Sequence, residues 1–444
     1  MKRIAIIGSG IAGLSFAWLA RQAGIQVTLF ESQPSLGMDA HSIDHPVARQ
    51  GLVAGESESD AVRVDVPPRM FNREDWPRLT GLYDFLGVES QAVDASKSFS
   101  TQDHSGWLKL GDQYRGGFPA ASLLSSKVRG VATETARMQA SVTTDAIAGM
   151  PTDLTLGQYL KQEKYRDDFV FDFLFPGLAA TVLTCSYEAL ANYPAKVALR
   201  SLLNQVDRSP LRRTTHGTAD VVRRLSEKVD DIRLSTRVAS IHQSNDGDKN
   251  SASVVCADGT ESHFDRLVVA TQANSAARLL RDEPTLRSAK EILDGFEYEN
   301  VSVVVHQDDS FMPTEQSHWR CFNFVSRVDR TDAMCTIWLN RFYPEWSQSG
   351  NVYQTIRPLT LPAEDKTITT SAMQRPVVSH ESLAAVKELK ALQATGSAKQ
   401  RVWFVGSYAA ASVPLLESGV ASAFEVARAM GIAIDAGLTA EATA

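Results

Sequence analysis

The sequence has few of the residues that mark metal centres and disulfide-bonded folds. Its only cysteines are Cys185, Cys256, Cys321 and Cys335, and they form no CxxC pair and have no histidine cluster beside them. This pattern argues against a zinc site and a disulfide framework, so we expect no bound metal and a reducing, cytoplasmic location. The net charge of −7 provides no basic surface, and we therefore expect no nucleic-acid partner.

Long apolar runs are also absent. No run of roughly eighteen or more apolar residues is free of charges or glycine turns, so we expect no membrane-spanning helix. The nearest approach is Phe169–Leu183, which is too short and contains Asp172 and Pro176. A buried core helix is the simplest interpretation of this run. The alternatives are the lining of a tunnel for an apolar substrate and a peripheral membrane contact.

The most informative feature that is present is the segment ending at Glu31. Residues 3–7 are apolar and rich in β-branched side chains, the glycine-rich hexapeptide GSGIAG follows at once, and residues 14–23 have helical character. Residues 27–30 read as a second strand, directly before the acid. Strand, glycine turn, helix, strand and acid together form the full context of the dinucleotide-binding fingerprint. The segment therefore predicts a site for an adenine dinucleotide.

Each glycine of that fingerprint has a physical reason. Gly8 permits the tight turn, Gly10 lets the backbone approach a pyrophosphate, and Gly13 lets the helix pack closely on the strand. The helix N-terminus supplies N–H groups and a positive dipole end for phosphates. Glu31 can accept hydrogen bonds from a ribose diol and would repel a 2′-phosphate.

Two other interpretations of the same residues remain. Lys2 and Arg3 followed by apolar residues resemble a secretory signal peptide. Three glycines, Ser9 and Ser15 interrupt the apolar stretch, however, and Glu31 would then have no role. The second alternative is a glycine-rich turn that binds nothing.

The rest of the chain alternates between helix and strand patterns. Pro67 and Pro68 end a strand at residues 63–66, and Gly87 ends an amphipathic helix at residues 76–86. A helix is expected near residues 193–206 and another at 220–228. Strands are expected at residues 232–234, 237–241, 253–260 (a hairpin) and 265–271. From about residue 300 to 400, strands at 301–306, 320–325 and 334–339 suggest a half-exposed antiparallel sheet.

The C-terminal part of the chain returns to an α/β pattern. Residues 401–408 form a strand that ends at a glycine, and a loop and a helix at residues 420–430 follow. We therefore expect a discontinuous nucleotide-binding domain from residues 1–85, 215–300 and 400–436. A second domain from residues 86–214 and 301–399 would be inserted into it, and residues 437–444 would form a flexible tail.

Four segments of this sequence resemble the flavin-containing amine oxidase clan. They are GSGIAGL with the later FE, VDVPPRMFN, DRLVVAT, and VWFVGSY with LLESGVASA. The clan includes amine oxidases, protoporphyrinogen oxidase and phytoene desaturases. Within it, the sequence is most similar to bacterial FAD-dependent oxidoreductases associated with cyclopropane-fatty-acid synthases. The resemblance implies an α/β fold, with a Rossmann-type, glutathione-reductase-like FAD-binding domain and an inserted α+β substrate domain with a mixed or antiparallel sheet.

The resemblance also implies which residues hold non-covalent FAD. The glycine-rich turn would wrap the pyrophosphate, Glu31 and Ser32 would meet the adenosine ribose, and Val238 would contact adenine through its backbone. Arg69 and Tyr408 are candidates for contact with the flavin or substrate. The full set implied for the cofactor is Gly8, Ser9, Gly10, Ile11, Ala12, Gly13, Glu31, Ser32, Gly37, Met38, Pro68, Arg69, Val238, Thr271, Gly406, Ser407, Glu417, Gly419 and Val420.

Several positions depart from the clan's pattern. Ser407 replaces an acid, and Leu416 and Ser418 change a polar motif at the final helix. Leu36 and Met38 replace a glycine and a basic residue. No cysteine lies near the C-terminal motif, so a cysteinyl-flavin bond is not available there.

The sequence favours an FAD-dependent oxidoreductase that takes a hydride from a C–H of an apolar, possibly fatty-acyl, substrate to flavin N5. An amine oxidase, a double-bond isomerase and a flavin-binding partner without catalysis are the alternatives. For Arg69 the simplest interpretation is a solvent-facing side chain, and for Tyr408 a packed ring is an equal alternative. Trp319 and Asn323 would either face the substrate or pack within the second sheet, and His318 is expected at the surface.

Overall fold

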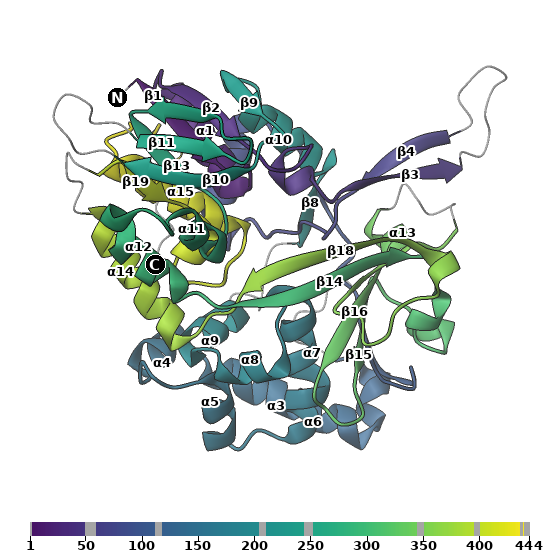
Figure 1. Ribbon diagram of the computed structural model, residues 1–444. Coiled ribbons are helices and arrows are strands. Elements are labelled where there is room, and N and C mark those ends of the chain that lie inside the picture. Colours follow the sequence, from purple (N-terminus) through teal and green to yellow (C-terminus); the bar gives the residue numbers. More distant parts are fainter. Residues whose placement is uncertain are drawn as a thin grey trace.

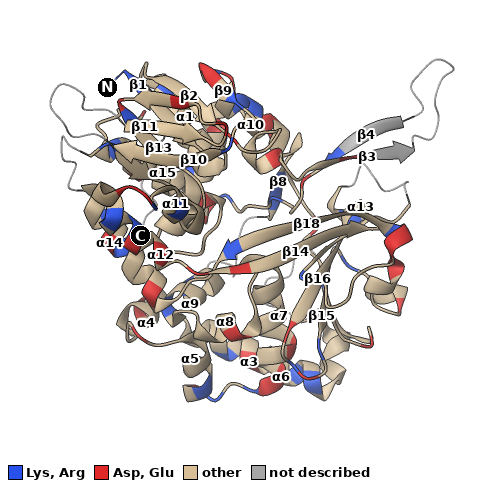
Figure 2. Cartoon of the chain, in the orientation of Figure 1, with Lys and Arg blue, Asp and Glu red and all other residues tan. Residues whose placement is uncertain are grey.

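The computed structural model of the chain describes residues 2–48, 59–111, 118–203, 210–243, 252–343, 350–394, 400–435 and 438. Two large sheets organise these residues, and a cluster of helices lies beneath the second sheet (Figure 1). Acidic and basic residues are interspersed over both parts in Figure 2. Within the described residues, no helix combines the length and apolar character needed to cross a membrane.

The first sheet is parallel and five-stranded, with the order β19-β13-β1-β2-β9. Four residues of both β1 and β2 are buried, which explains their near-continuous apolar sequence. Strands far apart in the sequence are neighbours here. The bounds are β1 (Arg3–Ile7), β2 (Gln26–Phe30), β9 (Asp231–Arg233), β13 (Arg266–Val269) and β19 (Val402–Phe404).

Helices pack on one face of this sheet and a mixed layer packs on the other (Figure 1). The expected helix before Gly87 is confirmed, since α2 ends there and Gly87 has a left-handed φ of 67°. The first layer contains α1 (Ile11–Gln22), α2 (Pro77–Leu86), α10 (Gly217–Ser226) and α15 (Leu416–Ala429). The second contains β10 (Val238–Gln243), β11 (Ala252–Cys256), β12 (Glu261–Phe264), α11 (Ala273–Leu279), α12 (Arg287–Asp294) and α14 (His380–Ala394).

The second sheet is seven-stranded and mixed, with the order β18-β14-β17-β16-β15-β6-β7. Its only parallel pair among the described strands is β15 with β6. The expected half-exposed character is wrong for its centre: every residue of β15 and β17 is buried, because helices cover one face and residues around Phe311 pack on the other. The bounds are β6 (Lys97–Thr101), β7 (Gly106–Leu110), β14 (Tyr298–His306), β15 (Phe322–Ser326), β16 (Ala333–Trp338), β17 (Tyr353–Ile356) and β18 (Thr367–Pro376).

The apolar run at residues 169–183 is a buried helical segment, as the sequence predicts. Two π-helical stretches, η3 (Val170–Leu174) and η4 (Leu178–Val182), flank Pro176 within it. Asp172, the charge inside the run, forms ion pairs with Lys127 at 2.8 Å and Arg330 at 3.0 Å. The surrounding helices are α3 (Ser126–Ser141), α4 (Thr144–Gly149), α5 (Leu156–Gln162), α6 (Asp167–Phe169), α7 (Phe175–Gly177), α8 (Tyr187–Asn192) and α9 (Ala195–Leu203).

Small elements complete the described chain. A two-stranded ribbon of β3 (Ile43–Ala48) and β4 (Ser59–Val64) extends away from the body (Figure 1). The strands β5 (Ser90–Ala92) and β8 (Arg212–Thr214) form an antiparallel pair. The short helix α13 (Leu339–Phe342) lies between β16 and β17 of the second sheet in the chain. The expected tail at residues 437–444 and the end of the helix expected at 193–206 lie outside the described residues, apart from Leu438.

Candidate functional site

The glycine-rich turn lies between β1 and α1 and has the geometry that its sequence predicts. Gly8 has a φ of +100°, which disfavours any side chain. A Cβ on Gly13 would lie 2.1 Å from the Gly8 carbonyl oxygen, so close packing of helix and strand requires glycine there. Gly10 caps α1 and differs from both, because no atom lies within 4 Å of the place where its Cβ would be. The backbone at Gly10 is therefore open to a ligand, at a helix N-terminus suited to phosphate.

Glu31 is directed at this turn. Its Oε2 accepts hydrogen bonds from the Ser9 amide at 3.1 Å and the Ser9 hydroxyl at 2.5 Å, and its Oε1 accepts one from the Gln33 amide at 2.9 Å. Ser32 adds a weaker contact to Oε1 at 3.3 Å. The Ser9 hydroxyl oxygen in turn accepts a hydrogen bond from the Gly37 amide at 2.7 Å. The acid thus fixes the turn.

A cavity of about 1390 Å³ begins at this turn and continues to the second sheet. Pockets for single drug-sized ligands measure roughly 300–1,000 Å³, so the cavity has room for a cofactor and a second molecule. Of the cofactor residues implied by the sequence, the cavity is lined by Gly10, Ile11, Ala12, Gly37, Met38, Pro68, Arg69, Thr271, Gly406, Ser407 and Glu417. The cavity lining does not include Gly8, Ser9, Gly13, Glu31, Ser32, Val238, Gly419 and Val420.

The C-terminal strand and helix close the cavity from the other side. The Gly406 amide donates a hydrogen bond to the Ser422 hydroxyl at 3.0 Å, which ties the loop after β19 to α15. Glu417 lines the cavity, but its carboxylate accepts hydrogen bonds from the Arg78 and Leu79 amides at 3.1 and 2.8 Å. Burial raises the pKa of Glu417 above its usual value, although these two hydrogen bonds act in the opposite direction. Glu417 therefore holds the N-terminus of α2 against α15.

Tyr408 is a packed ring that also reaches the cavity. Its ring meets Phe296 edge-on, with centroids 5.0 Å apart, and it is 5% exposed. Burial raises the pKa of Tyr408 well above its usual value, and its hydroxyl has no hydrogen-bond partner among the described residues. The structure thus shows the packed ring, and contact of Tyr408 with a flavin stays a prediction.

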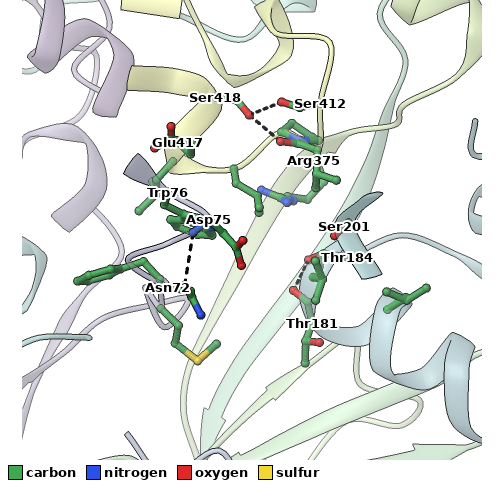
Figure 3. Close-up of a pocket in the computed structure, with 18 of the residues that line it drawn as sticks. Asn72, Asp75, Trp76, Thr181, Thr184, Ser201, Arg375, Ser412, Glu417 and Ser418 are labelled. Atoms are coloured by element: carbon green, nitrogen blue, oxygen red, sulfur yellow. Dashed lines mark hydrogen bonds between the residues drawn. The ribbon is translucent and has the colours of Figure 1, made fainter. Parts of the chain in front are cut away.

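Arg69 does not face solvent, which corrects the simplest interpretation of the sequence. It lines the cavity beside Arg375 of β18, and the Nε atoms of both are buried without a partner among the described residues. Burial lowers the pKa of both guanidinium groups. The charge of Arg69 lowers the pKa of Arg375 further, whereas Asp65 raises that of Arg69. Figure 3 shows the Arg375 side chain extending into the cavity toward Asp75 and Trp76. The sequence contains no local signal for this pairing.

The inner part of the cavity is apolar. The helical segment at residues 169–183 forms one wall, and the cavity-facing side chains of the second sheet form the other. Thr181, Thr184 and Ser201 lie opposite Asp75 and Trp76 in Figure 3. Apolar residues of this chamber that the sequence did not identify include Phe99, Leu110, Val301, Val303, Phe322, Phe324, Ile356 and Met373.

Two candidates from the second sheet are structural. Asn323 is fully buried and bonds to the Ser98 hydroxyl at 2.8 Å and to the Thr336 carbonyl at 3.1 Å. Trp319 donates its indole N–H to the Pro313 carbonyl at 2.7 Å. Neither residue lines the cavity. Among the described residues, no group of histidines, cysteines and acids has a metal-binding arrangement.

Two comparisons with known proteins address the N-terminal part of the chain. A family described as "NAD(P)-binding Rossmann-like domain" matches residues 6–86. A methylenetetrahydrofolate–tRNA-(uracil-5-)-methyltransferase of Mesorhizobium japonicum is 42% identical over 62 residues, which is 13% of each chain. This relative is similar in one segment only.

Solved structures are similar over nearly the whole chain. A protein described as a protoporphyrinogen oxidase from Exiguobacterium sp. 255-15 is 14% identical with a TM-score of 0.62, over 97% of this chain and 98% of its own. Wild-type putrescine oxidase bound to putrescine gives the same identity, TM-score and coverage. The fatty acid isomerase from P. acnes that produces CLA is 13% identical with a TM-score of 0.63, over 97% and 98%. These likenesses confirm that the chain has the fold of the flavin amine oxidase clan, with a Rossmann-like dinucleotide-binding domain in its N-terminal part.

Proposed function

We propose that the protein is an oxidoreductase that binds FAD non-covalently and acts on a small substrate with an apolar, fatty-acyl body. One observation carries this proposal: a single cavity connects the open backbone at Gly10 with the apolar chamber beside residues 169–183. Bound FAD would supply the acceptor for a hydride from a substrate C–H. No cysteine is among the described residues that line the cavity, which supports non-covalent binding.

Different residues along the cavity would contact different parts of the cofactor and the substrate. The turn at Gly10 and the N-terminus of α1 would bind the pyrophosphate, and Glu31 would order the turn and meet the ribose. Gly406, Ser407 and the start of α15 would meet the flavin. The apolar walls would exclude water and align the substrate.

The charges in the cavity favour an acid over an amine as substrate. Of the two carboxylates that line it, Glu417 is engaged by the N-terminus of α2. An amine would need an aromatic cage or a free carboxylate to bind its cation. The charged residues lining the cavity are Arg69, Lys97, Lys196, Arg200, Arg375, Asp75 and Glu417. This excess of cations suits the carboxylate of a fatty acid, and the fatty acid isomerase among the structural neighbours acts on such a molecule.

Anaerobic spectroscopy tests the proposal. The purified protein is mixed with unsaturated and saturated fatty acids and, separately, with primary amines, while the visible absorbance of its flavin is followed. We expect bleaching with a fatty acid, and mass spectrometry of the extract should show a product with two fewer hydrogens. Bleaching with amines alone would refute the acyl substrate, and protein that neither contains nor binds FAD would refute the whole proposal.

The same samples examine the other functions that this fold can support. A double-bond isomerase would change the fatty acid without lasting bleaching, because the hydride returns to a different carbon. A binding protein without turnover would hold FAD yet leave every lipid and amine unchanged. The product analysis therefore distinguishes these functions, whatever the spectrum shows.

A further inference from the structure

Lys97 occupies an unusual place in the wall of the apolar chamber. It is the first residue of β6, where side chains alternate between the two faces, so it shares a face with Phe99. Its partners across the sheet are Leu110 of β7 and Phe322 of β15. All four side chains line the cavity. Three apolar neighbours therefore surround an amine that faces the space for the substrate.

Nothing in the described part of the chain neutralises this amine. No carboxylate forms an ion pair with Lys97, and the titratable group that acts on it is the buried thiol of Cys335, whose pKa burial raises. Burial lowers the pKa of Lys97 itself. Lys97 is half-buried, and partial desolvation of an unpaired ammonium costs free energy. Water in an empty cavity can hydrate the amine, but an apolar ligand that displaces this water cannot.

We propose that Lys97 is a specificity-determining residue that binds the carboxylate of the substrate at the inner end of the chamber. This inference rests on the proposed function and adds the orientation of the substrate. The strands that carry Lys97 and Arg375 are five strand spacings apart, which is on the order of 24 Å along the sheet. A carboxylate at Lys97 leaves the acyl chain to extend along the apolar face of the sheet toward the dinucleotide turn. The position of Lys97 then determines which carbon reaches the flavin.

Lys109 provides a matched control on the neighbouring strand. It pairs with Ser98, so it lies on the opposite face from Lys97. Its Nζ donates a hydrogen bond to the Ser317 carbonyl at 3.4 Å, and it does not line the cavity. Replacing it removes the same charge from the same part of the sheet without changing the chamber.

The experiment compares K97M, K97R and K109M with the wild-type holoenzyme. Each protein is titrated with a long-chain fatty acid and with the alcohol of the same chain length, and the perturbation of the flavin spectrum gives the dissociation constant. Steady-state rates with both ligands give KM and kcat. Flavin content and thermal unfolding show that each variant is folded and loaded.

We expect K97M to weaken binding of the acid by about ten- to a hundredfold, the effect of losing one charge-assisted hydrogen bond. Binding of the alcohol should change less than about threefold, and K97R and K109M should resemble the wild type. Equal weakening of acid and alcohol in K97M, or no weakening of either, would overturn the role of Lys97 and leave the proposed function standing. A wild-type protein that binds neither ligand would overturn both.

Discussion

The replacement of Gly10 by alanine isolates cofactor binding from folding. No atom lies within 4 Å of the new Cβ, and the φ of −63° at this residue is accessible to alanine. Two effects on the apoprotein oppose each other. The lower entropy of the unfolded chain stabilises the protein by about 0.4–1 kcal/mol. Alanine is a poorer N-cap than glycine and costs about as much. We therefore expect the free energy of unfolding of the apoprotein to change by less than about 1 kcal/mol.

The effect on FAD should be much larger. The open space at Gly10 is where the backbone would approach the pyrophosphate, so the added methyl group displaces a phosphate oxygen from the N-terminus of α1. A hydrogen bond to a charged group contributes about 1.5–3 kcal/mol, and its loss weakens binding by roughly ten- to a hundredfold. We expect G10A to fold normally and to purify with little flavin. Fluorescence titration of the apoprotein with FAD measures the dissociation constant.

Two further glycines make this experiment decisive. In G13A the new Cβ would lie 2.1 Å from the Gly8 carbonyl oxygen and 2.9 Å from the Ala270 Cβ, so the backbone must move and the apoprotein should lose about 1–3 kcal/mol of stability. Gly81, in the middle of α2, has open space around its Cβ and does not line the cavity. G81A should stabilise the protein and leave FAD affinity unchanged. If G10A binds FAD as tightly as the wild type, the dinucleotide does not occupy this turn.

Three other changes test the cavity and the core. R375M removes a half-buried cation whose Nε has no partner among the described residues, so we expect the melting temperature to stay or rise; a clear loss of stability would contradict this. G177L fills open space in the chamber wall, and it should block turnover of long acyl chains while flavin content stays constant. His306 is fully buried, and burial lowers its pKa to about 4, so stability should fall by about 3 kcal/mol as pH drops from 6.5 to 4. Urea unfolding of H306Q should show a flatter dependence over that interval.

The N-terminal unit could be predicted because its signals are local. Apolar β-branched runs and fixed glycine spacing gave β1 and β2 within a residue of the structure, although α1 begins at Ile11 rather than Leu14. The helix around Pro176 was also predictable, because a long apolar run that is too short to span a membrane is most simply buried in a core. The three helical residues missed at the start of α1 belong to the glycine motif, where the helix begins inside the turn.

Other features depend on tertiary contacts that no sequence window contains. The helix α14 lies in a region where we expected strands, and its Ala385, Val386 and Leu389 are buried against the second layer of the first sheet. Central strands of the second sheet are buried on both faces because distant segments cover them, so alternation alone misjudged their exposure. The environment of Arg69 was misjudged for the same reason. Its neighbour Arg375 is far away in the sequence.

The charges of the cavity show how function can be located without a motif. Arg69 follows β4, Lys97 begins β6, and Arg375 lies near the end of β18. Each is half-buried, and none has a carboxylate partner among the described residues that bonds to it. Apolar side chains of similar size at these positions would make the protein more stable. Three segments that are far apart in the sequence thus place cations around one cavity, although their desolvation costs free energy. We therefore expect the anion that neutralises them to belong to a molecule that the cavity binds.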